Sequence, residues 1–324
     1  MALEIEPFRS HPPQRGAVDN AGRRTLVVGL VNNMPDTALE ATEAQFSRLL
    51  SAACESLTVR LRFYFLPEVP RGAAGQAHIS GDRYWPIETL QADPPDALIV
   101  TGTEPVAPLL SDEPYWGRFR ELLEWAQANT TSSIWSCLAA HAAVEILDGI
   151  RRRRLPHKRC GVFAHTADAS QSLLQGVAVP LHTPHSRWNE LPLGALRDQG
   201  YTIVSASPES GADMFTKHSG SLLVFFQGHP EYEATTLLRE YRRDVGRYLR
   251  GQQDHYPTLP EGYFSPEARD CLRAFETRAR AARDGELLNE FPTNALAETL
   301  KNTWSDAAIG IYRNWLNLLA RHAS

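Results

Sequence analysis

The sequence is poor in cysteine and has no excess of positive charge, and each shortage excludes a class of protein. Four of its 324 residues are cysteine, and their positions show no paired metal-ligand spacing. Neither a disulfide-rich secreted scaffold nor a cysteine-based metal site is therefore expected. The formal net charge of -5 gives no basic excess for general nucleic-acid binding.

Long apolar runs are also missing. No stretch approaches the apolar length of a membrane span. The segment from Met1 to Arg24 contains prolines and charges but lacks the apolar core of a signal peptide. We therefore expect a cytoplasmic protein that binds neither membrane nor nucleic acid.

Hydrophobic residues make up 43% of the chain and charged residues 22%, which is enough for one large α/β domain with additions or for two small domains. Continuous apolar runs at Thr25–Val31 and Ala97–Val100 are typical of strands covered on both faces. Helical periodicity follows the first run at Leu39–Ala53 and the second at Tyr115–Gln127. This alternation predicts the α/β class, with a mostly parallel sheet flanked by helices.

Composition divides the chain into three parts. Residues 1–23 mix prolines, glycines and charges and are predicted to form a flexible N-terminal arm. Residues 24–264 form the predicted α/β domain, in which Pro184–Glu190 is a polar segment that we interpret as a loop. Residues 265–324 contain two helical patterns, 266–283 and about 295–321, which predict a C-terminal helical extension packed on the core.

One stretch, Ser132–Val144, contains a β run that ends on Cys137 and is followed at once by small, helix-forming residues. This order predicts a strand, a sharp turn and a helix, with the cysteine at the carboxyl edge of the sheet. Helix N-terminal amides at that place favour a thiolate and can also bind an oxyanion. The alternative is a buried structural cysteine, since cysteine is among the most buried residue types.

A second stretch favours the catalytic alternative. The apolar run Leu222–Phe226 ends in Gln227-Gly228-His229-Pro230-Glu231, which places His229 and Glu231 just beyond another strand. A cysteine nucleophile needs a base, and the base needs a carboxylate that orients it. Cys137, His229 and Glu231 are therefore the candidate catalytic residues.

Several short motifs occur together and are specific as a set. They are Asn33-Met34-Pro35, Thr42-Glu43-Ala44-Gln45-Phe46, Tyr115-Trp116, Pro184-His185-Ser186-Arg187, Gly228-His229-Pro230-Glu231-Tyr232, Glu240-Tyr241, Arg243-Asp244 and Tyr312-Arg313-Asn314-Trp315. On these motifs the chain resembles the homoserine O-acyltransferases of the MetA type, a branch of the flavodoxin-like, class I glutamine-amidotransferase-like fold. The likeness spans roughly residues 25–264 and returns near the C-terminus, whereas 266–300 has no assigned counterpart.

The resemblance implies roles for individual residues. The family's nucleophilic cysteine, catalytic histidine and glutamate fall on Cys137, His229 and Glu231. The backbone amides of Leu138 and Gly102 are expected to hold the oxyanion. Substrate-binding positions are implied on the acyl-donor side at Lys158 and near the amino-acid acceptor at Ser186, Arg187, Glu240 and Arg243.

The resemblance also implies an activity, the transfer of an acyl group from acyl-CoA to the hydroxyl of L-homoserine in methionine biosynthesis. The acyl group passes through a cysteine thioester, so ping-pong kinetics are expected. Acyl-CoA, as succinyl-CoA or acetyl-CoA, is then a co-substrate, and neither a bound cofactor nor a metal is expected. The family further suggests a homodimer.

One family position goes with the acyl donor: glutamate with acetyl-CoA and glycine with succinyl-CoA. In this chain that position falls on Val106, counted without gaps from Thr101-Gly102 to Tyr115-Trp116. Valine has no charge to repel a succinyl carboxylate, although it fills space that glycine leaves open, and Glu104 restores the repulsion if the loop shifts by two residues. Because apposed like charges cost more than one or two methyl groups, we favour succinyl-CoA.

Three alternatives remain open from the residues. The same mechanism can act on another hydroxy amino acid. A glutamine amidotransferase or amidase shares the Cys with His-Pro-Glu arrangement, although the glycine-rich frame of that cysteine is missing, since Ser136 and Ala139 flank Cys137. A catalytically inactive binding protein on the same fold is the third alternative, and the intact triad argues against it.

Overall fold

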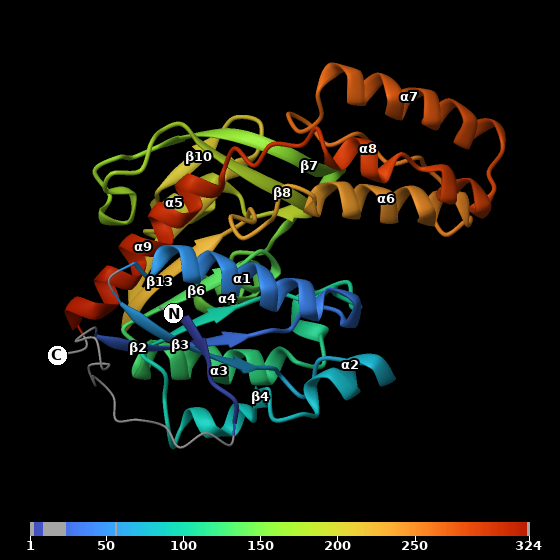
Figure 1. Ribbon diagram of the computed structural model, residues 1–324. Helices are drawn as coiled ribbons and strands as arrows, with labels where there is room; N and C mark the ends of the chain where they lie inside the picture. Colours follow the sequence, from blue (N-terminus) through green and yellow to red (C-terminus); the bar gives the residue numbers. More distant parts are fainter. Residues whose placement is uncertain (1–2, 9–23, 56, 323–324) are drawn as a thin grey trace.

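The computed structural model describes residues 3–8, 24–55 and 57–322, which form two sheets flanked by helices (Figure 1). The larger sheet has nine strands: β1 (Leu3–Ile5), β2 (Thr25–Val31), β3 (Thr58–Tyr64), β4 (Tyr84–Trp85), β5 (Ala97–Val100), β6 (Ser132–Ser136), β9 (Thr202–Ile203), β12 (Met214–Ser219) and β13 (Ser221–Phe226). The smaller sheet has four: β7 (Arg153–Ala167), β8 (Leu181–Glu190), β10 (Ser205–Ser207) and β11 (Gly211–Ala212).

The larger sheet has the order β1-β3-β2-β5-β6-β13-β12-β9, with β4 beside β3. All pairs from β1 to β13 are parallel, and only β12 and β9 are antiparallel to their neighbours. Every residue of β2 is buried, as its continuous apolar run predicts for a strand covered on both faces. The predicted α/β class with a mostly parallel sheet is confirmed.

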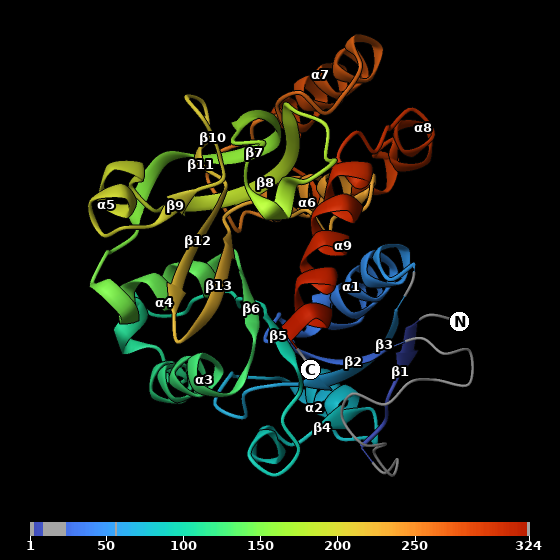
Figure 2. The same cartoon turned by 90° about the vertical axis from the view of Figure 1, so that its left-hand side faces the viewer.

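Helices cover both faces of this sheet. The α-helices are α1 (Leu39–Ala53), α2 (Ala73–Ile79), α3 (Trp116–Asn129), α4 (Leu138–Asp148), α5 (Leu193–Asp198), α6 (Thr236–Leu249), α7 (Pro266–Ala281), α8 (Thr293–Ala297) and α9 (Ser305–His322). Short 3-10 helices are η1 (Asp36–Ala38), η2 (Ile87–Leu90), η3 (Leu110–Asp112), η4 (Ser172–Leu174) and η5 (Gly285–Glu290). Helices α1 and α9 pack on one face and α3 and α4 on the other (Figure 2).

A third hydrophobic cluster, besides those on the two faces of this sheet, lies where α7 and α8 pack on α6. The single helix predicted over about 295–321 is wrong, because the chain is broken between α8 and α9. Asn302 causes the break: its Oδ1 accepts hydrogen bonds from the backbone N–H groups of Trp304 at 3.3 Å and Ser305 at 2.9 Å. A side chain that accepts from these amides caps a new helix start.

The loop predicted over Pro184–Glu190 is also wrong, because these residues belong to β8, which pairs antiparallel with β7. Its partner β7 is 15 residues long. Polar side chains obscured β8 in the sequence. His185 and Arg187 are nonetheless buried, since they bind partners inside the protein instead of solvent.

The flexible arm predicted over residues 1–23 is wrong for residues 3–8. Strand β1 pairs in parallel with β3, and the buried Glu6 carboxylate accepts a hydrogen bond of 3.0 Å from Arg62 Nε. A buried ion pair of this kind holds the segment against the sheet edge. Residues 9–23 lie outside the described part of the chain. Within that part, no helix is long and apolar enough to cross a membrane.

Candidate functional site

Cys137 lies in the sharp turn between β6 and α4, as the sequence predicts. Its backbone angles are φ 53° and ψ -112°, and it is the one non-glycine residue in the described chain with positive φ. The backbone N–H of Cys137 donates to Phe226 O, at the end of the adjacent β13, over 2.8 Å. A strained residue fixed by its neighbours is typical of a functional site. The turn places a partly exposed thiol at the N-terminus of α4.

Gly102 faces this turn from the end of β5. A Cβ atom on Gly102 would lie 2.6 Å from Leu138 Cβ and 3.0 Å from Leu138 N, so only glycine permits the approach of the two backbones. Asn33 fixes the preceding residue, since its backbone N–H donates to Thr101 Oγ1 over 2.9 Å and its side-chain amide to Thr101 O over 3.2 Å. Backbone amides gathered beside a nucleophile can bind an oxyanion.

His229 and Glu231 lie in the loop that leaves β13. His229 Nδ1 and Glu231 Oε1 are 2.8 Å apart. This leaves Nε2 for the Cys137 thiol, which is close enough to raise the pKa of the imidazole. The backbone N–H of His229 donates to Pro184 O on β8 over 2.8 Å. The structure therefore brings the three predicted catalytic residues together.

The environment of His229 favours its charged form. Burial alone lowers the pKa of this imidazole, but the Glu231 carboxylate and the Cys137 thiolate oppose that effect and together raise the pKa well above 6.5. An imidazolium held between two negative groups is the state expected of an activated cysteine–histidine pair.

His141 and Gln227 form a buried hydrogen-bonded pair between α4 and the loop after β13, which the sequence did not predict. Gln227 Oε1 accepts from His141 Nε2 at 3.0 Å and from the backbone N–H of Leu191 at 2.8 Å. Burial, assisted by the nearby Arg187 and Arg152, lowers the pKa of His141 to about 3. His141 is therefore neutral, and it braces α4 against the loop after β13.

Lys158 and Glu240 meet between β7 and α6. Lys158 Nζ lies 2.7 Å from Asp244 Oδ2 and 3.7 Å from Glu240 Oε2. Burial disfavours the ammonium, but Glu240, Cys160 and Asp244 outweigh it and raise the pKa of Lys158 above 10.5. Glu240 is held from two further sides, by the Ser186 hydroxyl, which donates to Oε2, and by the Tyr232 hydroxyl, which donates to Oε1 over 2.6 Å.

Arg243 lies on the same helix and is half exposed, with 49% of its side chain accessible. Its guanidinium binds Asp244 Oδ1 at 3.0 Å through one terminal nitrogen and at 3.1 Å through Nε. Arg243 therefore keeps donor capacity toward solvent, which a carboxylate ligand can use.

The loop after β5 approaches α6 at Glu104, whose Oε1 lies 3.6 Å from Arg247. Val106, two residues further, is 73% exposed. Its side chain is therefore free of close packing, and a bulkier ligand does not have to displace core atoms there.

Arg187 is the predicted substrate-binding residue that the structure uses differently. It is buried, and its donors point to His185 Nδ1 at 3.2 Å, Asn189 O at 2.7 Å and Ser210 O. Burial and the nearby Arg159 lower the pKa of Arg187 to about 10. With its donors engaged, Arg187 joins β8 to the neighbouring loop.

His165, His185 and Asp213 form a buried cluster whose ligand atoms lie within 4.8 Å of one another. His185 Nδ1 accepts from Arg187 Nε, so the ring proton of neutral His185 is on Nε2, which faces Asp213 Oδ1 at 3.3 Å. A protonated nitrogen cannot ligate a metal. The cluster is better explained as a neutral histidine beside a carboxylate.

The remaining cysteines differ from Cys137. Cys54 and Cys160 are buried and Cys271 is exposed on α7. Burial raises the pKa of Cys160 to about 12, with Glu240 and Asp244 adding to the effect and Lys158 opposing it. A thiol that stays protonated is a poor nucleophile.

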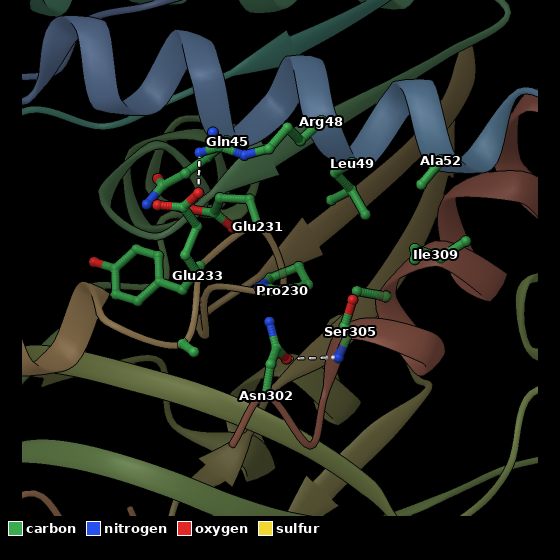
Figure 3. Close-up of a pocket in the computed structure, with 13 residues that line it drawn as sticks. Gln45, Arg48, Leu49, Ala52, Pro230, Glu231, Glu233, Asn302, Ser305 and Ile309 are labelled. Atoms are coloured by element: carbon green, nitrogen blue, oxygen red, sulfur yellow. Dashed lines mark hydrogen bonds and ion pairs between the residues drawn. The ribbon is translucent and has the colours of Figure 1, made fainter. Parts of the chain in front are cut away.

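A cavity of about 360 Å³ lies beside the loop that leaves β13, between α1 and α9 (Figure 3). Glu231 reaches its wall, and Glu231 Oε2 has no hydrogen-bond partner within the described chain. Arg48 of α1 pairs with Glu233 across the same cavity. The cavity therefore contacts the triad through its carboxylate.

Comparisons with known structures report distant likenesses. A glutamine amidotransferase from Thermotoga maritima is 12% identical with a TM-score of 0.47, covering 91% of this chain and 97% of that one. A glutamine amidotransferase from Methylobacillus flagellatus is 14% identical with a TM-score of 0.49, covering 91% and 94%.

Comparisons of sequence are far closer. A homoserine O-succinyltransferase from Rhodopseudomonas palustris is 47% identical over 301 residues, covering 93% of this chain and 90% of the relative. One from Bradyrhizobium japonicum is 46% identical over 296 residues, covering 91% and 90%. One from Methylobacter tundripaludum is 39% identical over 299 residues, covering 92% and 84%.

The sequence model of the family described as homoserine O-succinyltransferase matches residues 13–323. The match includes residues 266–300, for which the motifs had offered no counterpart, so α7 and α8 lie within the region that the family model spans. The resemblance inferred from the motifs is confirmed. This chain belongs to the homoserine O-succinyltransferase family.

Proposed function

We propose that this member of the family transfers a succinyl group from succinyl-CoA to the hydroxyl of L-homoserine, a step of methionine biosynthesis, through a thioester on Cys137. The observation that carries the proposal is the hydrogen-bonded His229–Glu231 pair, close enough to Cys137 for the thiol to raise the pKa of His229, in a chain that matches the family over nearly its whole length.

In the first half-reaction the Cys137 thiolate attacks the thioester carbonyl carbon of succinyl-CoA. The resulting tetrahedral oxyanion accepts hydrogen bonds from the backbone amides of Leu138 and Gly102, which the close packing of the two segments supports. The carbon–sulfur bond to CoA then breaks, and the CoA thiolate takes the proton of the His229 imidazolium. Cys137 is left acylated and His229 neutral.

In the second half-reaction the acceptor hydroxyl attacks the thioester on Cys137. Neutral His229 takes the hydroxyl proton as a general base while Glu231 holds its Nδ1–H. When the second tetrahedral intermediate collapses, the Cys137 thiolate leaves and the ester is released. The thiolate–imidazolium pair is thereby restored.

Arg243 and Glu240 are the proposed acceptor ligands. The exposed side of the Arg243 guanidinium suits the α-carboxylate of homoserine, and Glu240 suits its ammonium. Lys158 is not proposed as a ligand of the substrate, because its ammonium is already paired with Asp244 and Glu240. We propose that Lys158 instead fixes these two carboxylates beside the acceptor. Ser186 supports Glu240 in the same way.

The donor assignment is supported by the surface position of Val106. Because its side chain is 73% exposed, the steric objection to a succinyl group is weak, and Glu104 is engaged with Arg247. The homodimer implied by the resemblance stays a prediction, which sedimentation velocity tests.

Initial-rate kinetics test the proposal. With succinyl-CoA and L-homoserine varied together, double-reciprocal plots should be parallel, and kcat/KM should be higher for L-homoserine than for L-serine. Intersecting plots would contradict a thioester intermediate. A preference for L-serine would show that the acceptor is another hydroxy amino acid.

A further inference from the structure

Tyr232 follows Glu231 directly and contacts both halves of the site. Its ring stacks on the His229 imidazole, with centroids 4.2 Å apart and planes at 15°. Its hydroxyl donates to Glu240 Oε1 over 2.6 Å. Its backbone carbonyl accepts from Trp304 Nε1 over 2.7 Å. One residue therefore joins the base, the acceptor-binding carboxylate and the C-terminal region.

We propose that Tyr232 is a positioning residue that couples acceptor recognition at Glu240 to the orientation of the His229 imidazole. The ring keeps the imidazole plane directed at Cys137, and the hydroxyl fixes the carboxylate that receives the acceptor ammonium. The inference rests on the acceptor role proposed for Glu240.

The ring adds a restraint that Glu231 cannot supply alone. A single hydrogen bond at Nδ1 still allows the imidazole to pivot about that bond, whereas a parallel aromatic face permits motion only within the plane. The same face favours a cation beside it, so it stabilises the imidazolium. The titratable groups that act on His229 besides Tyr232 are Glu231, in the same loop, and Cys137, at the turn before α4.

The hydroxyl is suited to hold Glu240. Burial and the nearby Glu240 and Glu231 carboxylates raise the pKa of Tyr232 well above 10, so the phenol stays protonated and donates. Each carboxylate oxygen accepts more than one hydrogen bond. Glu240 can therefore bind an ammonium while Tyr232 and Ser186 hold its orientation.

Trp304 holds the backbone of Tyr232 through its indole N–H. It is 1% exposed and lies just before α9, where Asn302 caps the helix start. Figure 3 shows Asn302 and Ser305 beside Pro230 on the wall of the cavity behind the loop. The C-terminal region thus contacts the catalytic loop at its backbone.

Two substitutions separate the ring from the hydroxyl. Tyr232→Phe keeps the stacked face and removes the donor, and we expect the KM for homoserine to rise about tenfold, the effect of one hydrogen bond to a charged group. The rate of Cys137 succinylation should stay within about twofold of wild type, because that half-reaction needs no acceptor. Tyr232→Leu keeps an apolar cover but loses the aromatic face, so the alkaline limb of the pH–rate profile should move to lower pH.

Tyr201→Phe is the matched control. Tyr201 also donates to a carboxylate, Asp148 Oδ2 at 2.5 Å, but at the end of α4 opposite Cys137. For this variant we expect the wild-type KM for homoserine and the wild-type rate of Cys137 succinylation.

An unchanged homoserine KM in Tyr232→Phe would overturn the coupling, even if Tyr232→Leu does not fold. Equal losses in both half-reactions would show a merely structural role. Failure of wild-type enzyme to acylate Cys137 would instead refute the proposed function.

Discussion

The predicted catalytic residues and the proposed acceptor-binding residues are held in place in different ways. Cys137, His229 and Glu231 lie at the ends of parallel strands and are fixed largely by backbone contacts, such as Cys137 N to Phe226 O and His229 N to Pro184 O. Glu240 and Arg243 project from α6 and are fixed by side chains that surround them.

This difference predicts how substitutions in each half of the site affect activity. A centre held by backbone contacts has one geometry, so a substitution that disturbs this geometry should cause a large loss of turnover. In a cluster of paired side chains, neighbouring groups can compensate for the loss of one member. We therefore expect large losses of turnover at the strand ends and smaller changes in KM along α6.

His229→Ala should cause the largest loss of kcat among the five substitutions compared here. Without the base, kcat should fall by about 10²- to 10⁴-fold, the usual contribution of general acid–base catalysis. The KM for homoserine should change little, since the proposed mechanism assigns His229 to the reacting hydroxyl and assigns recognition to Glu240 and Arg243. Steady-state rates measure both constants, and turnover near that of wild type would show that another group is the base.

Gly102→Ala tests the backbone-built centre without touching the triad. The added methyl would overlap Leu138 Cβ at 2.6 Å and separate the two oxyanion segments. We expect kcat to fall by about 10²- to 10³-fold, as when one oxyanion donor is lost. Gly117→Ala, on α3, where no atom lies near an added Cβ, is the matched control. Equal activity of the two variants would remove Gly102 from the oxyanion site.

Glu231→Gln tests the electrostatics of the pair. Removing the carboxylate charge should lower the pKa of His229, because Glu231 is the largest of the groups that raise it. The imidazolium then loses its proton at lower pH, so the alkaline limb of kcat/KM moves to lower pH and turnover falls by about a hundredfold. An alkaline limb at the wild-type position would mean that Glu231 does not control the protonation of His229.

Arg243→Lys tests the acceptor-binding side. Lysine keeps the charge but loses the planar fork, so the KM for homoserine should rise about tenfold while the KM for succinyl-CoA stays nearly constant. Arg239→Lys, on the same helix and 52% exposed, is the control. Parallel increases in both Michaelis constants would identify Arg243 as a structural partner of Asp244.

Val106→Glu should have the smallest effect, because the side chain is exposed to solvent. A new negative charge there should lower kcat/KM for succinyl-CoA by about five- to tenfold through screened repulsion and leave acetyl-CoA nearly unaffected. Val106→Gln controls for size. A succinyl preference that survives in Val106→Glu would show that this position does not select the donor.

The contrast between residues at strand ends and residues held by distant side chains also explains which features could be predicted from the sequence. Cys137 and His229 follow apolar runs that predict strand ends, so the fold and the placement of the candidate triad could be inferred from local pattern. Strand β8 was misread because His185 and Arg187 are polar yet buried, and their burial depends on partners distant in sequence. Resemblance alone pointed to Glu240 and Arg243. The contact of Tyr232 with Trp304, which supports the role proposed for Tyr232, joins residues distant in sequence that no local pattern connects.

The central claim is that Cys137 holds the acyl group, and intact-mass spectrometry tests it most directly. After incubation with succinyl-CoA and no acceptor, the wild-type chain should gain the mass of one succinyl group, and adding L-homoserine should remove it. Cys137→Ala should gain none, whereas Cys271→Ala, which lacks only an exposed thiol, should behave as wild type. A succinyl group that persists in Cys137→Ala, or that L-homoserine does not remove, would contradict the account.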